Sequence, residues 1–236
     1  MAKRLEGRLA LVTGASRGIG AATAEALAAE GAHVILTART AASLEEIESR
    51  IHDAGGSATI APLDLTEGDS IARLATAFVE RWQALDILVL NAAMLGPLTP
   101  AAQIESGEFN RVLTLNLLAQ QALLANFDQM LRNSSQGRLI VLTSTVAQKP
   151  RAFWGAYGAS KAALENLVLS YGEEVSNLSS VKVAIVNPGA TATTMRARAF
   201  PGEDPATLKP PSAVADAIVE LLVEEFDTGY RLHIEG

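Results

Sequence analysis

Apolar residues follow two alternating patterns along this chain. Short runs of four to six residues, rich in Val, Ile and Leu, fall at 9–12, 34–37, 58–63, 87–90, 139–143, 181–186 and 230–234. Such continuous runs are typical of strands that are buried on both faces of a parallel sheet. Longer stretches with helical spacing lie between them, at 19–30, 41–54, 69–81, 107–131, 154–175 and 211–225. The pattern therefore predicts strands and helices in alternation.

Alternation of this kind predicts βαβ units with right-handed crossovers. The expected fold is of the α/β class, a doubly wound, Rossmann-type parallel sheet of about seven strands with helices on both faces. The 236 residues fit one large α/β domain, and no internal repeat or linker divides them. We therefore expect residues 1–236 to form a single domain.

The least regular stretch is 190–211, which contains four prolines and follows the sixth predicted strand. In a doubly wound sheet, the loops at the carboxyl ends of the strands border the ligand crevice. The stretch is therefore either a lid over a substrate or a plain surface excursion.

Composition removes several classes of function. The net charge of −7 argues against a general surface for nucleic acid or anionic membranes. There is no cysteine, and His33, His52 and His233 are scattered, so we expect neither disulfides nor a metal site. No signal peptide is recognisable, and no apolar stretch approaches the roughly 20 residues that span a bilayer. We expect a soluble cytoplasmic protein with neither nucleic-acid nor membrane partners.

A glycine-rich turn follows the first predicted strand. Gly14, Gly18 and Gly20 have the spacing G-x-x-x-G-x-G and lead directly into a helix. Glycines let the chain turn tightly and approach a ligand, and the N–H groups of a helix N-terminus bind phosphate. The spacing differs from the G-x-G-x-x-G fingerprint, so a tight turn with a purely structural role is the alternative.

The end of the second predicted strand indicates which dinucleotide would bind. An acidic residue there would hold ribose hydroxyls, whereas an arginine suits a 2′-phosphate. This chain has Arg39 at that place and Arg17 in the glycine turn, and two guanidinium groups can bind one dianion. We favour NADP over NAD, the alternative being two solvated surface arginines.

Tyr157 and Lys161 lie four residues apart, on one face of a predicted helix. A tyrosine with a pKa of about 10 is a poor base at neutral pH. An ammonium about 4 Å away, at an effective dielectric of ~20, would favour the phenolate by about 4 kcal/mol. That is enough to bring the pKa to about 7–8, so we expect Lys161 to lower the pKa of Tyr157.

Two further polar residues fit the same chemistry. Ser144, at the end of the fifth predicted strand, could donate a hydrogen bond to a substrate oxygen. Asn116 stands midway along the 107–131 helix, where asparagine is unfavourable unless a partner holds it. A water or lysine partner near the site would explain it, and an exposed asparagine is the alternative.

These motifs together resemble the short-chain dehydrogenase/reductase family over essentially the whole chain. The matches are Thr13-Gly14-x-x-x-Gly18-x-Gly20, Asp64, Asn91-Ala92, Asn116, Ser144, Tyr157-x-x-x-Lys161 and Pro188-Gly189-x-x-x-Thr193. The segment 195–205 is also similar to a bacterial subgroup of oxidoreductases with no assigned substrate.

The resemblance implies a role for each matched residue. Tyr157 would be the general acid/base, and Lys161 its electrostatic partner and a ligand of the nicotinamide ribose. Ser144 would orient the carbonyl, Asn116 would hold a proton-relay water, and Asp64 would meet the adenine amino group. Thr193 and the backbone near Asn91, Pro188 and Gly189 would line the nicotinamide end. The full set of implied cofactor-binding residues is Gly14, Ser16, Arg17, Gly18, Ile19, Gly20, Arg39, Asp64, Leu65, Asn91, Ala92, Tyr157, Lys161, Pro188, Gly189 and Thr193.

One motif departs from the family pattern. The usual Asn-Asn-Ala-Gly after the fourth strand is here Leu90-Asn91-Ala92-Ala93. Leucine cannot make the hydrogen bonds of the first asparagine, and Ala93 adds a methyl group near the cofactor.

The expected function is an NADPH-dependent oxidoreductase that acts on a carbonyl or secondary-alcohol small molecule. Hydride would pass between the nicotinamide and the carbonyl carbon, and Tyr157 would transfer the proton. The alternative is a catalytically silent regulatory or scaffold protein that binds the dinucleotide on the same fold. The resemblance also implies a homodimer or homotetramer in which the long helices 107–131 and 154–175 pair across subunits.

Overall fold

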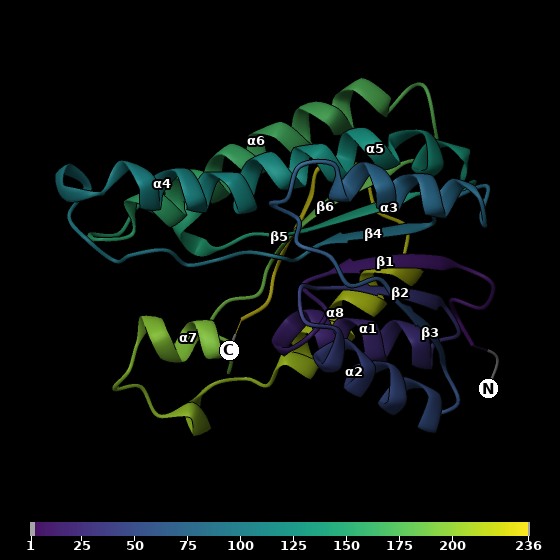
Figure 1. Cartoon of the computed structure of the whole chain (residues 1–236), viewed down its shortest axis with the longest axis horizontal. Coiled ribbons are helices and arrows are strands. Elements are labelled where there is room, and N and C mark those ends of the chain that lie inside the picture. Colours follow the sequence, from purple (N-terminus) through teal and green to yellow (C-terminus); the bar gives the residue numbers. More distant parts are fainter. Residues whose placement is uncertain (1–2, 236) are drawn as a thin grey trace.

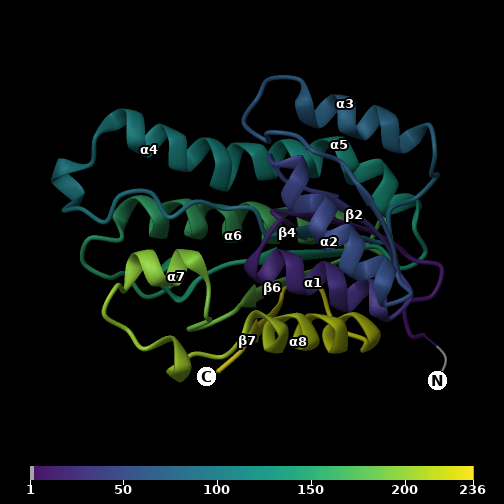
Figure 2. The ribbon, with the colours of Figure 1, turned by 60° about the horizontal axis from the view of Figure 1, so that its bottom comes forward.

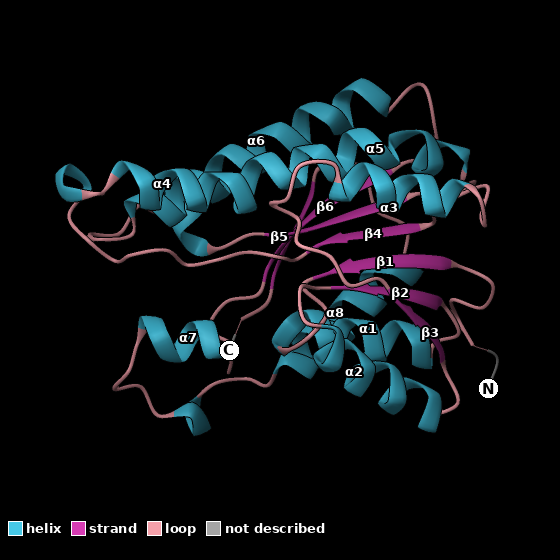
Figure 3. Cartoon of the chain, in the orientation of Figure 1, coloured by secondary structure: helices cyan, strands magenta, loops and turns pink. Residues whose placement is uncertain are grey.

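Seven parallel strands form one sheet in the order β3-β2-β1-β4-β5-β6-β7 (Figures 1 and 3). The computed structural model describes residues 3–235. The strands are β1 (Leu9–Thr13), β2 (His33–Thr37), β3 (Ser57–Ile60), β4 (Ile87–Leu90), β5 (Arg138–Leu142), β6 (Lys182–Asn187) and β7 (Tyr230–His233). All seven predicted strands are present, and β3 ends three residues earlier than the apolar run at 58–63.

The strands read as continuous apolar runs because both faces of the sheet are buried. In β1, Ala10 and Val12 belong to one hydrophobic core, and Leu9 and Leu11 belong to the other. Successive side chains point to opposite faces, so a strand between two helical layers needs apolar residues at every position. The structure therefore confirms the prediction that the apolar runs are strands buried on both faces of a parallel sheet.

Two layers of helices cover the sheet (Figures 1 and 2). The principal helices are α1 (Gly18–Ala29), α2 (Ala41–Asp53), α3 (Ser70–Val79), α5 (Ala119–Asn133), α6 (Gly155–Val175) and α8 (Pro211–Val223). Apolar side chains of α1, α2 and α8 form the core on one face, and those of α3, α5 and α6 form the core on the other. Within residues 3–235, no helix is both long enough and apolar enough to cross a bilayer.

The predicted helix 107–131 is not continuous. It consists of α4 (Ser106–Leu113), a π-helical turn (Thr114–Leu118) and α5. In that turn the N–H of Ala119 donates to the carbonyl of Thr114, five residues back. The wider turn contains Asn116, and π turns in α-helices are frequent at functional sites.

The segment 190–211 is more regular than its composition predicts. It contains α7 (Thr194–Ala199) and a 3-10 turn (Pro205–Thr207). Thr191 and Lys209 form an isolated bridge at its base, so the excursion is closed at its neck. Both α4 and α7 lie beyond the edge to which the strand arrows point (Figure 3). The excursion is therefore at the ligand-binding edge of the sheet, as expected.

Candidate active site

The strand order reverses between β1 and β4, and the predicted site residues surround this point. The chain leaves β1 toward β2 on one side, whereas β4 lies on the other side of β1. Ligands of open α/β sheets bind at such a switch point, outside the carboxyl ends of the strands. The glycine turn follows β1, Asn91 follows β4, Ser144 follows β5 and Pro188 follows β6.

The glycine turn leaves no room for side chains at two of its positions. A Cβ on Gly20 would lie 2.3 Å from the carbonyl oxygen of Gly14, and a Cβ on Gly14 would lie 2.9 Å from Nδ2 of Asn91. Gly14 and Gly18 also have positive φ angles of 66° and 58°. No side chain caps the N-terminus of α1, whose N-cap residue is Arg17. Its first N–H groups are thus open to a phosphate-bearing ligand.

Thr13 and Asn91 lock this turn to the end of β4. The Thr13 hydroxyl donates to the carbonyl of Val89 and accepts from the N–H groups of Asn91 and Ala92, each at 3.0 Å. The Asn91 amide donates to the carbonyl of Thr13 at 2.8 Å. Thr13 was not among the predicted binding residues, and its role here is to hold the backbone.

Asp64 and Arg39 lie near each other at the ends of β3 and β2. The backbone N–H and hydroxyl of Thr66 donate to one Asp64 carboxylate oxygen, at 2.8 and 2.7 Å. These bonds, with a smaller contribution from the Arg39 charge, hold the pKa of Asp64 below its ordinary value. Arg39 is exposed. The Leu65 side chain is buried in the core, so only its backbone can meet a cofactor.

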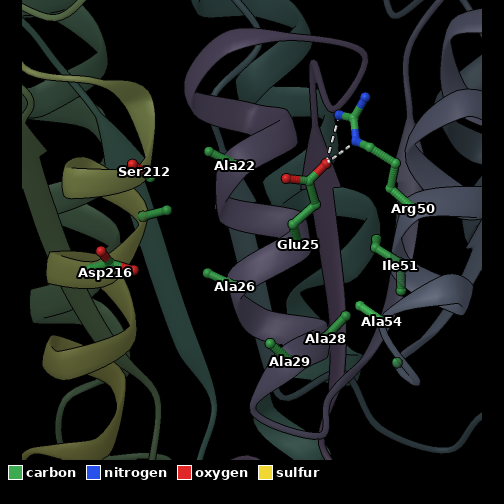
Figure 4. A pocket seen from close by; sticks show the side chains of 12 residues that line it. Ala22, Glu25, Ala26, Ala28, Ala29, Arg50, Ile51, Ala54, Ser212 and Asp216 are labelled. Atoms are coloured by element: carbon green, nitrogen blue, oxygen red, sulfur yellow. Dashed lines mark hydrogen bonds and ion pairs between the residues drawn. The ribbon is translucent and has the colours of Figure 1, made fainter.

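Arg17 borders a separate hollow on the outer side of the glycine turn. The hollow has a volume of about 440 Å³, and Ser16, Gly18 and Arg50 also line it. A second groove, of about 360 Å³, continues between α1, α2 and α8 (Figure 4). Half of its lining residues are alanines, and the Glu25–Arg50 ion pair also lines it. The groove is lined by no residue predicted to take part in catalysis.

Tyr157 and Lys161 lie together near the start of α6, as their spacing predicts. Tyr157 is 7% exposed and Lys161 is 2% exposed. Nζ of Lys161 lies 6.0 Å from the centroid of the Tyr157 ring and donates to the carbonyl of Leu142 at 2.8 Å. The ammonium is therefore held between α6 and the end of β5.

The electrostatics of this pair differ from our expectation. Burial raises the pKa of Tyr157 to about 12. Burial also lowers the pKa of Lys161 to about 8, although the nearby Glu165 carboxylate opposes this. We expected Lys161 to bring the pKa of Tyr157 down to about 7–8. That expectation is wrong for this arrangement, because burial disfavours the charged forms of both groups.

Ser144 follows β5 and begins a 3-10 turn, Thr145–Ala147, that packs on α6. A Cβ on Gly158 would lie 3.1 Å from the carbonyl oxygen of Val146. Glycine at 158 thus lets the serine turn approach the helix one residue after Tyr157. Ser144 is half-buried, so its hydroxyl can reach a substrate.

Glu165 fixes the segment that carries Ser144, and the sequence reading missed it. Its carboxylate accepts hydrogen bonds from the Thr143 hydroxyl, from Gln148 at 3.1 Å and from Arg231 at 2.6 Å. Burial alone would raise the pKa of Glu165, but these bonds together hold it below its ordinary value. The four-residue spacing from Lys161 could have predicted that Glu165 lies beside it on the helix. Nothing in the sequence predicted the contact of Glu165 with Arg231 in β7.

Asn116 is completely buried and holds the loop after β4. Its Oδ1 accepts from the N–H of Met94 at 2.8 Å. Its Nδ2 donates to the carbonyl of Met94 at 2.9 Å and to the Ser160 hydroxyl at 3.0 Å. The exposed alternative is therefore wrong. Both ends of the amide have protein partners, so a relay water would have to meet the backbone of the π turn.

Gln120 supports the same loop, and it too was missed. Its Nε2 donates to the carbonyls of Ala92 and Leu115, at 3.0 and 2.9 Å. This support bears on the departure at Leu90, whose side chain is buried in the core. The loop is held by amides from the neighbouring helix rather than by an asparagine at position 90.

The loop after β6 completes the site. Gly189 has a φ of 61°, and its N–H donates to the Asn187 side chain at 3.1 Å. The Thr191 hydroxyl donates to the carbonyl of Pro188 at 3.0 Å. Thr193 caps α7, and its methyl carbon would lie 3.5 Å from a Cβ on Gly18. Thr193 therefore lies over the glycine turn.

Comparisons with known proteins agree with this geometry. The family model described as short chain dehydrogenase matches residues 8–204. The oxidoreductase YciK of Escherichia coli K12 is 34% identical over 224 residues, which cover 94% of this chain and 88% of YciK. A short chain dehydrogenase structure from Pseudomonas syringae has a TM-score of 0.95 and 36% identity, covering 99% of this chain and 96% of that one.

A short chain dehydrogenase from Shigella flexneri, solved in complex with NADP, has a TM-score of 0.94 and 33% identity. The match covers 99% of each chain. Both the sequence and the fold match over nearly the full length, and the motifs stand at the same edge of the sheet. The chain belongs to the short chain dehydrogenase family.

Proposed function

We propose that this protein is an NADPH-dependent carbonyl reductase with Tyr157 as its proton donor. The observation that carries the proposal is the buried Tyr157–Lys161 pair, held at the end of β5 beside Ser144. The site edge also carries a glycine turn that fits a pyrophosphate, and a similar protein was solved with NADP. Arg39 at the end of β2 suits the 2′-phosphate.

The proposed reaction transfers one hydride and one proton to the carbonyl group. The carbonyl carbon would receive a hydride, which is one proton with two electrons, from bound NADPH. The Tyr157 hydroxyl gives its proton to the carbonyl oxygen, so the products are an alcohol and NADP⁺. Tyr157 then regains a proton from solvent. Its pKa of about 12 keeps the hydroxyl protonated at neutral pH, so it is ready to donate its proton in the reduction.

The other chain residues have supporting roles in this proposal. The Ser144 hydroxyl donates to the carbonyl oxygen and stabilises the negative charge that develops there. The Lys161 ammonium stabilises the phenolate left after proton transfer and hydrogen-bonds the ribose. Asn116 and Gln120 fix the loop that borders the nicotinamide end, and Asp64 meets the adenine.

We also propose that segment 190–211 acts as a substrate lid and that the protein is a cytoplasmic homo-oligomer. The lid proposal is supported by the closed neck at Thr191 and Lys209 and by the contact of Thr193 with the glycine turn. The oligomer proposal is supported by Leu118, a large apolar residue at the end of the π turn that is 58% exposed.

Replacing Tyr157 tests the mechanism. Tyr157→Phe should retain NADPH binding, measured by fluorescence titration, and should lose about 100-fold or more of the reductase kcat. Tyr230→Phe, on the exposed β7, is the matched control and should keep full activity. Unchanged turnover in Tyr157→Phe would refute the mechanism. A wild-type protein that binds NADPH but reduces no carbonyl compound would favour the catalytically silent alternative.

Replacing Arg39 tests the cofactor. Arg39→Asp should weaken NADPH binding by about tenfold or more, because the variant loses a phosphate ligand and gains a repulsive charge. The Kd of NADH should change much less. Equal losses for both cofactors would remove the 2′-phosphate argument.

A further inference from the structure

Three aromatic rings connect the lid segment to the catalytic tyrosine. The centroid of the Trp154 ring lies 6.1 Å from that of Tyr157, with the planes 69° apart. On its other side Trp154 meets Phe200, at the end of α7, with the centroids 5.6 Å apart and the planes inclined by 32°. The wall between the lid and Tyr157 is therefore aromatic and apolar, which suits an apolar substrate body.

Arg151 stacks on this aromatic wall. Its guanidinium carbon lies 4.9 Å from the centroid of Phe200 and 5.9 Å from that of Trp154. The N–H of Trp154 donates to the carbonyl of Arg151 at 3.2 Å, which makes a tight turn. Phe153, within this turn, has a φ of 72°, and its carbonyl accepts from the N–H of Thr99 at 3.1 Å. A residue held in this strained conformation keeps Arg151 and Trp154 adjacent.

Arg151 differs from its neighbour Arg196 in its pairing. The guanidinium of Arg196 also stacks on Phe200, but the Glu203 carboxylate binds it through two hydrogen bonds, at 2.6 and 2.5 Å. Among residues 3–235, no carboxylate forms an ion pair with Arg151, which is exposed. Stacking uses the faces of a guanidinium and leaves its edge N–H groups free for bidentate binding of an anion.

The two segments that carry the aromatic wall have a net positive charge, which is opposite to the net charge of the whole chain. The segments 145–157 and 190–210 together carry five basic and two acidic residues, whereas the net charge of the chain is −7. The basic ones are Lys149, Arg151, Arg196, Arg198 and Lys209, and the acidic ones are Glu203 and Asp204. A cleft with charge of one sign concentrates ligands of the other sign.

We propose that the substrate of this reductase carries a carboxylate at the end of an apolar body, and that Arg151 binds the carboxylate. This inference rests on the proposed function. The apolar body lies along Trp154 and Phe200, and the carbonyl group at its far end reaches Tyr157. The cofactor phosphates are not the anion in question, because the glycine turn and Arg39 bind them.

Matched aldehydes test the proposal. The probes are 4-formylbenzoate and 4′-formylbiphenyl-4-carboxylate, each with its neutral methyl ester. At least one carboxylate should have a kcat/KM about tenfold above that of its ester with the wild-type protein. Arg151→Gln should abolish this preference and leave the Kd of NADPH unchanged. Arg198→Gln removes an equal charge from α7 without a stacked ring, and it should keep the preference.

The outcomes separate the inference from the proposed function. Reduction of the four aldehydes without a carboxylate preference, or a preference that persists in Arg151→Gln, overturns only the inference. A loss of preference in both arginine variants also overturns it, because general charge would then be the cause. If the wild-type protein reduces none of these aldehydes but reduces other carbonyl compounds, only the inference fails. If it reduces no carbonyl compound of a broad panel, the proposed function fails and the inference fails with it.

Discussion

Burial makes the neutral forms of both Tyr157 and Lys161 more favourable than they are in water. For Tyr157 this keeps the phenol protonated at neutral pH, the form that the proposed reduction needs in its proton donor. For Lys161 it narrows the pH range in which the side chain is charged, because a lysine with a pKa of about 8 loses its charge only slightly above neutral pH. In the proposed mechanism, Lys161 stabilises the phenolate, so its own titration limits the pH range of reduction.

The pH dependence of reduction should report Lys161. Its pKa is lowered from the ordinary value, so the cation is present below about pH 8 and is lost as the pH rises through that value. Reductase kcat/KM should thus be level between pH 6 and about 7.5 and then fall about tenfold per unit of pH. Bound NADPH would raise the pKa of Lys161 and so shift this fall in rate, the alkaline limb of the profile, to higher pH, since its negative charge favours the cation. A rate that rises with pH over this range would contradict the assignment.

Two variants identify the titrating group. Arg does not deprotonate in this range, so Lys161→Arg should remove the limb from whatever activity remains. Glu165→Gln should move the limb to lower pH, because the Glu165 charge raises the pKa of Lys161. Glu173→Gln, at an exposed position on the same helix, is the control and should leave the limb in place.

The sequence predicted these residues better than it predicted their electrostatics. The four-residue spacing correctly placed Tyr157 and Lys161 together, because helical geometry alone decides it. The direction of the pKa shift depends on desolvation, which in turn depends on helices and loops far away in the chain. For the same reason Glu165 was missed: its partner Thr143 follows β5 and its partner Arg231 lies in β7.

At the scale of elements, the turn from β1 into α1 is the most sterically restricted part of the site. Gly20→Ala would place a methyl group 2.3 Å from a carbonyl oxygen, so the backbone of the turn must move. We expect NADPH binding to weaken by about 100-fold, which corresponds to ~2.7 kcal/mol. A binding titration measures this loss, and a thermal melt should show a lower Tm.

Gly107→Ala is the matched control for that substitution. Gly107 also lies in a helix, but a Cβ there would meet nothing within 4 Å. Because alanine favours helix, this change should be neutral or stabilising by up to about 1 kcal/mol. If Gly20→Ala behaves like Gly107→Ala in both measurements, the tight turn is not what positions the cofactor.

The elements that sequence predicted well are those whose pattern is set by local burial. All seven strands follow from continuous apolar runs between two helical layers. The π turn at 114–118 does not follow from any periodicity. It forms where Asn116 and Gln120 bind the loop after β4, and these are tertiary contacts that a local sequence pattern does not reveal. Helix α7 was missed because it is only six residues long and lies between prolines and charged residues.

At the scale of the whole molecule, the chain order of the strands determines where the site lies. The order reverses beside β1, so the loops after β1, β4, β5 and β6 meet at one edge although their residues are far apart in sequence. The topology could be predicted from strand and helix alternation, and so could the general location of the site. The aromatic wall of Trp154 and Phe200 could not, since it depends on how α7 folds back onto α6.

The layer formed by α3, α5 and α6 leaves apolar side chains on the outer surface of the protein. Leu118, the last residue of the π turn before α5, is 58% exposed, and Val79 at the end of α3 is 65% exposed. If α5 and α6 pair across subunits, Leu118→Glu should convert the oligomer to a monomer in size-exclusion chromatography with light scattering, because a buried carboxylate would be unpaired. Val79→Glu adds the same charge outside that pair of helices and should leave the assembly unchanged. A wild-type protein that is monomeric at tens of micromolar would contradict the assembly itself, whereas dissociation by Val79→Glu alone would move the interface to α3.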